Sequence, residues 1–442
     1  MSQPTIDLPA RLLHNLKPWR NAAAWRIAFS GGLDSTVLLH LLVDLAKTQS
    51  LPALSAIHIH HGLQAAADAW PEHCQAFCDG LGVPLQVVRV QVRPGPSLER
   101  AARDARYGAF IEATRLNEVL LTAQHRDDQA ETLLFRLLRG AGVRGLAGMP
   151  RQRPLGQGHL LRPLLDVARA DLEAYALQYH LRWIEDPSNQ DPQFSRNYLR
   201  HLVFPVLASR WPQAMSTMAR SAEHLSEAQG LLDELAQIDL GQARTVSEFD
   251  WLGVPSLELA ALATLSAARQ RNALSHWLAP LTPLPDSDHW SGWEDLRDAT
   301  VDARPIWRLA EGELHRAGGR IWWLSGQWLR QCAAVGPWAE PSRPLQLPGN
   351  GVVMLSGQIP AGPVQIRYRE GGEVMAVPGR GHRDLKRLLN ESGVPLFVRG
   401  RLPLLFQQGQ LLAVANLPGL DGSAAGGCKL HWQPSGEDQG LS

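Results

Sequence analysis

The sequence predicts an α/β fold: a domain with a parallel, doubly wound sheet comes first, followed by a helical domain and a small α+β C-terminal domain. Two observations lead to this prediction. Up to about residue 150, short apolar runs alternate with amphipathic helical stretches, which is typical of βαβ units with helices on both faces of a parallel sheet. Beyond that point the alternation gives way to Ala- and Leu-rich helical stretches and then, after a proline-rich linker, to short runs with glycine turns.

The elements of the first half follow in order. Expected strands are "WRIAF" (25–29), "ALSAIHIHHG" (53–62), "LQVVRVQV" (85–92) and "VLLTAQH" (119–125), and expected helices cover about 35–47, 68–79, 97–116 and 126–140. After residue 150 we expect a turn, a helix, a polar loop and a second helix that ends near Leu207. Three strands end at Ser30, His60–His61 and His125. Ligands bind beyond the carboxyl ends of parallel strands, so these polar ends predict one cleft.

We expect four regions along the chain. Residues 1–215 form the catalytic domain, 216–340 a mainly helical Trp-rich domain, 341–430 a small basic domain, and 431–442 a disordered tail. Nine of the fifteen tryptophans lie between Trp251 and Trp338, which predicts that they form a packing core.

Composition narrows the class of protein. The 43 Lys and Arg residues balance 43 Asp and Glu residues, so any nucleic acid must be met by a local basic face. Four cysteines are too few for a disulfide framework and indicate a reducing compartment. The N-terminus lacks a secretory signal, and its apolar runs are too short to span a bilayer. These features predict a cytoplasmic protein without a membrane partner.

The most informative segment is "SGGLDS" (30–35), between the first strand and the first long helix. Such a loop directs backbone N–H groups and a helix dipole at an anion, and glycines let a phosphate approach closely. It has no lysine of the kind that a P-loop uses in phosphoryl transfer. Its acid, Asp34, would repel phosphate unless it holds Mg²⁺ or orients another group. The segment therefore suits a grip on the pyrophosphate that leaves when ATP donates AMP, although a plain Gly-Gly turn is the alternative.

These residues resemble the PP-loop ATP pyrophosphatase family, and further motifs narrow the resemblance to the tRNA(Ile)-lysidine synthetase family. The motifs are "SLERAARDARYGAF", "QHRDDQAETLLFRLLRGAGVRGLAGM", "EDPSNQDPQFSRNYLR" and the C-terminal "LKRLL" and "VRGRLPLL". The resemblance is dense over residues 25–205 and recurs over about 365–415. It implies ATP and Mg²⁺ as cofactors, and free L-lysine and an isoleucine tRNA with a CAU anticodon as partners.

The reaction that this resemblance implies adenylates the C2 oxygen of the wobble cytidine, after which lysine displaces AMP and the codon read changes from AUG to AUA. Expected catalytic residues are Asp34, His125, Asp128 and Arg106, with Asp34 and Asp128 as the Mg²⁺ ligands. Residues expected to hold ATP are Ser30, Gly31, Gly32, Leu33, Asp34 and Ser35. Residues expected to contact tRNA or substrate are Arg103, Arg139, Arg144, Arg196, Arg383, Lys386, Arg387 and Arg399.

Structural explanations compete with several of these roles. A carboxylate at a helix start is favoured by capping, so Asp127 or Asp128 could be caps. Glu131 either supports the same helix face or pairs with Arg136 on the surface. A basic helix that follows a cap would equally account for Arg196 and Arg200.

The remaining charged clusters also have plain explanations. Arg103 and Arg106 either face the cleft or form exposed ion pairs with Glu99 and Asp104. His58, His60 and His61 lack the pattern of a zinc site and are interpreted as a strand end near the nucleotide. From 367 to 401, eight Lys and Arg residues oppose four acids, which favours docking on tRNA phosphates over a merely solvated surface.

Three other functions are weighed. A tRNA thiolase needs a reactive cysteine near the cleft, whereas Cys74 and Cys78 lie in a predicted helix away from the strand ends. An amidotransferase-type ligase needs a glutaminase domain, for which no residue set is evident. A non-catalytic tRNA-binding module would be expected to have lost the glycine loop. The oligomeric state stays open, with a homodimer as one option.

Overall fold

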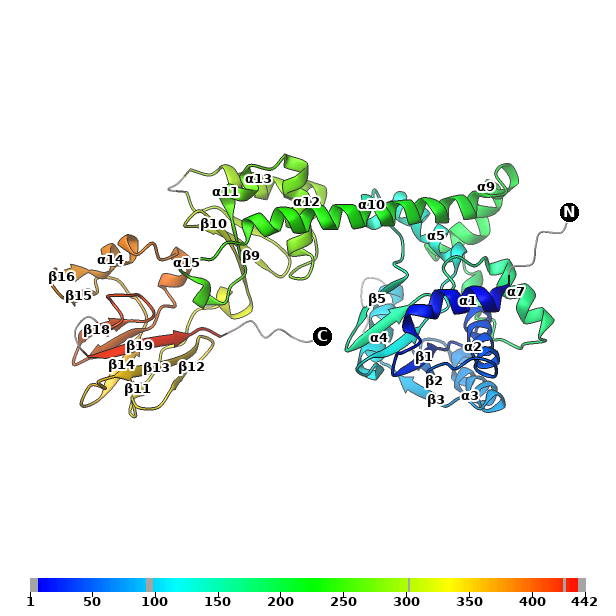
Figure 1. Ribbon diagram of the computed structural model, residues 1–442, viewed down its shortest axis with the longest axis horizontal. Coiled ribbons are helices and arrows are strands. Elements are labelled where there is room, and N and C mark those ends of the chain that lie inside the picture. The colour runs from blue at the N-terminus through cyan, green and yellow to red at the C-terminus, as the bar shows by residue number, and fades with distance from the viewer. Residues whose placement is uncertain (1–6, 93–97, 301–302, 424–426, 436–442) are drawn as a thin grey trace. The chain divides into compact units, whose positions relative to one another are not determined.

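The computed structural model describes residues 7–92, 98–300, 303–423 and 427–435 (Figure 1). Its contacts divide the chain into two compact units, residues 1–231 and residues 232–440. The division falls inside the long helix α10 (Ala214–Ala243). Each unit is described by itself below. No helix in the described ranges is long and apolar enough to cross a membrane.

A six-stranded sheet forms the centre of the first unit. Its strands, in spatial order, are β3 (Leu85–Arg89), β2 (Ala53–His60), β1 (Ala24–Ala28), β4 (Glu118–Leu121), β6 (Gly158–Leu161) and β5 (Gln152–Leu155). All neighbours are parallel except the β5–β6 pair, which is antiparallel. The predicted parallel sheet is confirmed. The sequence analysis missed β5 and β6, because their segment is rich in glycine, proline and polar residues and shows no apolar alternation.

Helices cover both faces of this sheet, so the doubly wound prediction is confirmed. The helices α1 (Leu8–Leu16), α2 (Leu33–Ala46), α3 (Trp70–Leu81) and α7 (Arg169–Gln178) pack on one face. Helix α4 (Leu98–Ala113) packs on the other. Successive strand residues point to opposite faces: Val119 and Leu121 enter the first core, and Leu120 enters the second.

The remaining helices of this unit follow the strand ends. They are α5 (Arg126–Leu137), α6 (Val143–Leu146), α8 (Ser195–Tyr198), a π-helical turn (Leu199–Val203) and α9 (Phe204–Arg210). Leu199 and Phe204 pack against Ala130 of α5 in a small separate core. The segment 195–210 is thereby fixed against the helix that begins at His125.

The middle of the chain is less helical than predicted. Helices α11 (Leu259–Ala263), α12 (Ala267–Leu278) and α13 (Ser291–Asp298) accompany a sheet of β7 (Ser256–Glu258), β10 (Arg320–Ser325), β9 (Gly312–Ala317) and β8 (Ile306–Arg308). The tryptophans do form packing cores, as expected. Strand β10 separates two of them, since Trp322 lies in one core and its neighbour Trp323 in the other.

The C-terminal part is α+β, as predicted. A six-stranded sheet contains β11 (Pro337–Trp338), β14 (Val364–Arg367), β17 (Leu404–Gln407), β18 (Gln410–Val414), β15 (Val374–Val377) and β16 (Gly381–Asp384). A second sheet contains β12 (Leu345–Leu347), β13 (Gly351–Gly357) and β19 (Cys428–Gln433), and the helices are α14 (Leu385–Glu391) and α15 (Leu396–Arg399).

Two of the predicted domain boundaries can be compared with the structure. The disordered tail predicted from residue 431 is wrong for 431–433, because these residues complete β19 and Trp432 is buried; residues 436–442 lie outside the described residues. One core joins Trp322 and Trp338 to the C-terminal strands, so a boundary at 340/341 would cross it. The four-region division otherwise stays a prediction.

Candidate functional site

The segment around Ile184 packs against the glycine turn that follows β1. Gly31 has φ +82°, and a Cβ there would lie 2.5 Å from Ile184 Cδ1 and 3.0 Å from Cys74 Sγ. The Ile184 N–H donates to the Gly31 carbonyl at 2.8 Å. Both the left-handed backbone and this close approach require glycine at position 31.

Hydroxyl groups close the turn onto the start of α2. Ser30 Oγ and Ser35 Oγ are 3.0 Å apart, and Ser30 Oγ accepts from the Gly32 N–H at 3.3 Å. Gly32 is the N-cap of α2 and provides no side-chain cap. The N–H groups of Leu33 and Asp34 in the first helical turn therefore remain directed toward an incoming anion.

Asp34 meets the end of the neighbouring strand through His125. His125 Nε2 lies 3.7 Å from Asp34 Oδ2, and the imidazole is buried. His125 is the N-cap of α5: its Nδ1 accepts from the Asp128 N–H at 3.3 Å, and Asp128 Oδ2 accepts from the His125 N–H at 3.0 Å. Two of the three polar strand ends from which a cleft was predicted, those of β1 and β4, therefore meet at this contact.

Asp34 and His125 each shift the pKa of the other toward the charged form. Burial would lower the pKa of His125, but the carboxylates of Asp128, Asp34 and Asp127 outweigh burial and raise that pKa. Burial would likewise raise the pKa of Asp34, whereas the hydrogen bond and charge of His125, with Arg169 and Arg200, lower it. Asp34 is thus a carboxylate at neutral pH. Its Oδ1 is buried and has no hydrogen-bond partner among the described residues.

Glu131 forms an ion pair with Arg200, a partner that neither of its two predicted explanations named. Arg200 Nε donates to Glu131 Oε1 at 2.7 Å and Nη2 donates to Oε2 at 2.9 Å, while Nη2 is 3.3 Å from Asp128 Oδ1. Glu131 is only 1% exposed. Pairing of Glu131 with Arg136 is wrong, because Arg136 donates to the carbonyls of Gly145 and Gly148.

Asp127 does not cap its own helix, as one of its two predicted explanations had it, but contacts the start of another helix. Its Oδ2 accepts from the Arg169 N–H at 2.6 Å, where α7 begins. The Arg126 N–H donates to the Val167 carbonyl at 2.8 Å. The loop after β6 is thus tied to the first turn of α5, and Asp127 holds this junction together.

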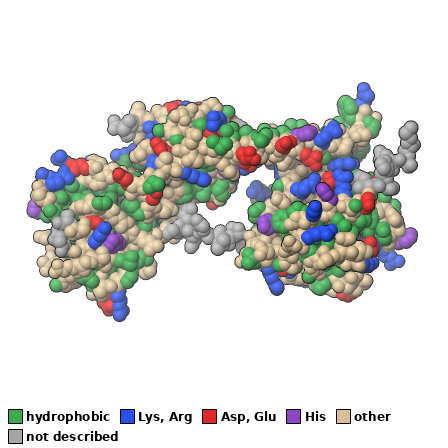
Figure 2. Space-filling model, in the orientation of Figure 1, with side chains coloured by type: hydrophobic (Ala, Val, Ile, Leu, Met, Phe, Trp, Pro, Cys, Tyr) green, Lys and Arg blue, Asp and Glu red, His purple; other side chains and the backbone are tan. Residues whose placement is uncertain are grey.

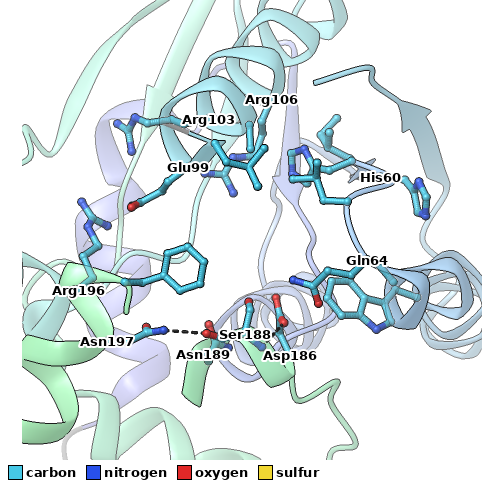
Figure 3. Close-up of a pocket in the computed structure, with 18 of the residues that line it drawn as sticks. His60, Gln64, Glu99, Arg103, Arg106, Asp186, Ser188, Asn189, Arg196 and Asn197 are labelled. Carbon is cyan, nitrogen blue, oxygen red and sulfur yellow. Dashed lines mark hydrogen bonds between the residues drawn. The ribbon is translucent and has the colours of Figure 1, made fainter. Parts of the chain in front are cut away.

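A pocket of about 440 Å³ adjoins this arrangement (Figure 3). Arg103, Arg106 and Glu99 enter it from α4, and Arg196 and Asp186 face them from the segment after α7. The predicted ion pairs of Arg103 and Arg106 with Glu99 or Asp104 do not form in the described part of the chain. Asp104 instead lies 3.8 Å from Arg100, and the Arg103 guanidinium lies 4.9 Å from the centre of the Tyr107 ring.

Histidines form another wall of the pocket. His58, His60 and His61 all line it. Burial, with the nearby charge of Arg106, lowers the pKa of His61 to about 4, so this ring is neutral at physiological pH. The described residues contain no group of three or more His, Cys, Asp or Glu side chains that could hold a metal ion.

Cys74 lies closer to the site than the sequence suggested. Its Sγ is 3.4 Å from His58 Nδ1 and would lie 3.0 Å from a Cβ at Gly31. Burial raises the pKa of this thiol to about 12. A buried, protonated thiol is a poor nucleophile, which disfavours thiolation chemistry at this position.

The other predicted tRNA contacts are dispersed. Arg139 lies over the Phe135 ring with its guanidinium carbon 5.2 Å from the ring centre, and Arg144 lies in α6; neither lines the pocket. In the second unit, Lys and Arg side chains gather over α14 and β16 (Figure 2). The exposed members there are Arg383, Lys386 and Arg387.

Several of these C-terminal cations already have partners. Arg387 Nε lies 2.9 Å from Glu391 Oε1, and Arg399 Nε donates to the Val394 carbonyl at 2.9 Å. Arg401, counted in the basic excess, is buried and donates to the carbonyls of Gln327, Arg330 and Gly349. Arg401 therefore joins chain segments inside the fold.

Sequence reasoning assigned no role to Arg169 or to the Glu131–Arg200 pair. No motif spacing pointed to either, because both depend on contacts between residues 42 to 69 positions apart. A polar loop rich in acids and arginines between two helices was the one available signal.

Comparison with known proteins gives consistent matches. The PP-loop domain family matches residues 5–207, the TilS substrate binding domain family residues 257–322, and the TilS substrate C-terminal domain family residues 364–433. A tRNA(Ile)-lysidine synthase of Pseudomonas fluorescens is 74% identical over 441 residues and covers 100% of both chains. That of Pseudomonas aeruginosa is 64% identical over 444 residues, covering 99% of this chain and 100% of the relative. That of Pseudomonas syringae pv. tomato is 63% identical over 436 residues, covering 99% and 98%.

Proposed function

This chain belongs to the tRNA(Ile)-lysidine synthase family, and we propose that it uses ATP to join lysine to C2 of the wobble cytidine in an isoleucine tRNA with a CAU anticodon. The product, lysidine, pairs with AUA instead of AUG. The observation that supports this chemistry is the juxtaposition of the glycine turn, the Asp34–His125 pair and an arginine-lined pocket in one unit.

The first step transfers AMP to the cytidine. The C2 oxygen of the base attacks the α-phosphorus, and the bond to pyrophosphate breaks, so negative charge moves onto the leaving group. Backbone N–H groups at the start of α2 and the hydroxyls of Ser30 and Ser35 hold the phosphates. Fixed donors of this kind stabilise the transition state because they need no reorganisation.

The second step replaces AMP with lysine. An unprotonated lysine amine attacks C2, the bond from C2 to the AMP-bearing oxygen breaks, and the nitrogen releases a proton. Both oxygens of Asp128 already accept hydrogen bonds, so its predicted contact with lysine would require one of them to be exchanged. Glu99 and Asp186 are the acidic residues that line the pocket, and we assign to them the binding of the lysine ammonium group that does not react.

The residues present fit a Mg²⁺ ion better at Asp34 than at Asp128. Asp34 Oδ1 is buried without a hydrogen-bond partner in the described ranges, while Asp128 is occupied by His125 and Arg200. Mg²⁺ is commonly held by one or two carboxylates together with phosphate oxygens and water. The ion would neutralise charge on the phosphates, and Asp34 would supply its protein ligand.

We further propose that the protein acts in the cytoplasm, where tRNA is modified. The four cysteines are free thiols, which agrees with a reducing compartment. Whether it works as a homodimer is tested by light scattering of the full chain with and without tRNA.

The decisive experiment measures pyrophosphate release and lysine incorporation with tRNA or lysine omitted in turn. We expect pyrophosphate release to require tRNA, and incorporation to require both. The CAU-anticodon methionine tRNA, which carries the same target base, should not be modified. Sulfur incorporation, tRNA binding without pyrophosphate release, or equal modification of both tRNAs would contradict the proposal.

A further inference from the structure

The glycine turn has no lysine, yet the phosphates it must hold carry several negative charges. Asp34, inside the turn, adds another negative charge. A cation from elsewhere in the fold is therefore needed. Three basic side chains are placed near Asp34 by their contacts: His125, which lies 3.7 Å from it, Arg200, which contacts Asp128 beside that ring, and Arg169, whose backbone N–H donates to Asp127.

Two of these three are committed to protein partners. The His125 ring is buried between Asp34, Asp127 and Asp128. The Arg200 guanidinium makes two hydrogen bonds to the buried Glu131 and a third contact to Asp128. If Arg200 turned to a phosphate, the buried Glu131 would lose its partner, which is costly, and if His125 did so, three partly buried carboxylates would lose theirs.

Arg169 is placed differently. It is the first residue of α7, and its backbone N–H is fixed by Asp127 Oδ2 at 2.6 Å. Asp127 Oδ2 lies 3.7 Å from His125 Nδ1, and His125 Nε2 lies 3.7 Å from Asp34 Oδ2. Helix α7 also packs against α2, the helix that follows the glycine turn (Figure 1). The base of the Arg169 side chain is thus anchored beside the turn.

The guanidinium of Arg169 is available to a ligand. The residue is exposed, and within the described part of the chain its side chain forms no hydrogen bond or ion pair. Apart from Arg200, the arginines that line the pocket are Arg103, Arg106 and Arg196; they approach from α4 and the 186–197 segment, and among the described residues none of them forms an ion pair with Asp34, Asp127 or Asp128. Of the three basic side chains near Asp34, Arg169 is therefore the one without a side-chain partner among the described residues.

We propose that Arg169 binds the β- and γ-phosphates of ATP and then the departing pyrophosphate, in the position that a P-loop lysine fills in other nucleotide-binding proteins. This assignment rests on the proposed function, because it takes ATP as the ligand of the turn. A planar guanidinium can donate two parallel hydrogen bonds to a phosphate group. Its anchored backbone limits the conformational entropy lost on binding.

The test compares ATP and AMP binding to the full-length protein by calorimetry, without tRNA or lysine. For Arg169→Gln we expect ATP affinity to fall by about 10- to 100-fold, the loss of charge-assisted hydrogen bonds, while AMP affinity stays within about twofold of wild type. Arg169→Lys keeps the positive charge but not the two parallel N–H donors of the guanidinium, so its ATP affinity should lie between those of wild type and Arg169→Gln. Arg210→Gln is the matched control, since Arg210 is an exposed arginine that ends α9 over Trp211, and it should change neither affinity.

Two results would overturn the assignment. One is unchanged ATP affinity in Arg169→Gln. The other is an equal loss of ATP and AMP affinity, which would mean that Arg169 shapes the turn instead of contacting the terminal phosphates. Because these measurements need no turnover, they stay separate from the proposed function: a protein that binds ATP through Arg169 but makes no lysidine would refute only the latter.

Discussion

Of the two adjacent glycines of the turn, only Gly31 should lose substantial stability when replaced by alanine. At Gly31 an L-residue must adopt φ +82°, which costs about 1–2 kcal/mol. The new Cβ would also lie 2.5 Å from Ile184 Cδ1, and overpacking of this kind costs about 1–3 kcal/mol. At Gly32 the backbone has φ −75°, and the nearest atom to a Cβ, Ser30 Oγ, is 3.5 Å away. Gly32→Ala should therefore change stability by no more than about 0.5 kcal/mol.

Thermal unfolding of the full-length protein without nucleotide measures this difference. A loss of about 3 kcal/mol in Gly31→Ala corresponds to about 6–12 °C in the melting temperature of a unit of this size. Adding Ile184→Val removes Cδ1, so the double variant should regain the steric part of the loss but not the backbone part. Equal melting temperatures for the two alanine variants, or no coupling between positions 31 and 184, would refute the reasoning.

Four further outcomes follow from the same structure. Asp34→Ala should reduce lysine incorporation to less than about a tenth of wild type, a barrier increase of about 1.4 kcal/mol or more, with tRNA binding retained in a filter assay. Because folding raises the pKa of His125, the stability that His125 contributes is complete below about pH 6.5 and is lost as the pH rises through its pKa in the folded protein. The difference in melting temperature between wild type and His125→Gln should therefore shrink from about pH 6 toward about pH 9. Replacing Arg383 and Lys386 together by Gln should weaken tRNA binding and lower the slope of log K against log salt by about 2, while ATP binding stays unchanged. Arg401→Met should instead destabilise the second unit by about 3 kcal/mol, since three carbonyls lose a charged donor, and a melting temperature equal to wild type would contradict this.

The sequence predicted well those parts of the site that depend on local pattern. Strand ends at Ser30 and His125 placed two loops at one edge of a parallel sheet, and the glycine loop indicated an anion site before any contact was known. The partners of the charged side chains were not predictable in this way. Glu131 has Arg136 five positions away on its own helix, but it pairs with Arg200, 69 positions along the chain. Such pairings are decided by how α5 and the 195–210 segment pack, which no periodicity records.

The same limit applies to the middle of the chain. Its helical segments were evident from their periodicity, while the strands around "RIWWLS" were not. In β10 every residue from Arg320 to Leu324 is buried, so the alternation of apolar and polar residues that marks a half-exposed strand is absent. Trp322 and Trp323 serve two cores at once, a role visible only when both faces of the strand are known.

The partners of the arginines separate structural positions from ligand-binding ones more sharply than their sequence context does. Arg136 and Arg401 donate to backbone carbonyls. They therefore stabilise loops and are not counted among the phosphate-binding residues. Arg106 and Arg196 share a pocket without a carboxylate partner among the described residues, a like-charge arrangement that an anionic ligand would relieve. The same criterion reduces the number of C-terminal residues that are candidates for the predicted tRNA contact. Of the eight basic residues counted there, those with backbone or acidic partners contribute little net attraction, and the surface that remains for a tRNA backbone is centred on β16 and α14, where the side chain of Lys386 is exposed. A basic excess counted in a sequence therefore overstates the surface that a nucleic acid can contact, because the count includes cations that already have partners within the fold.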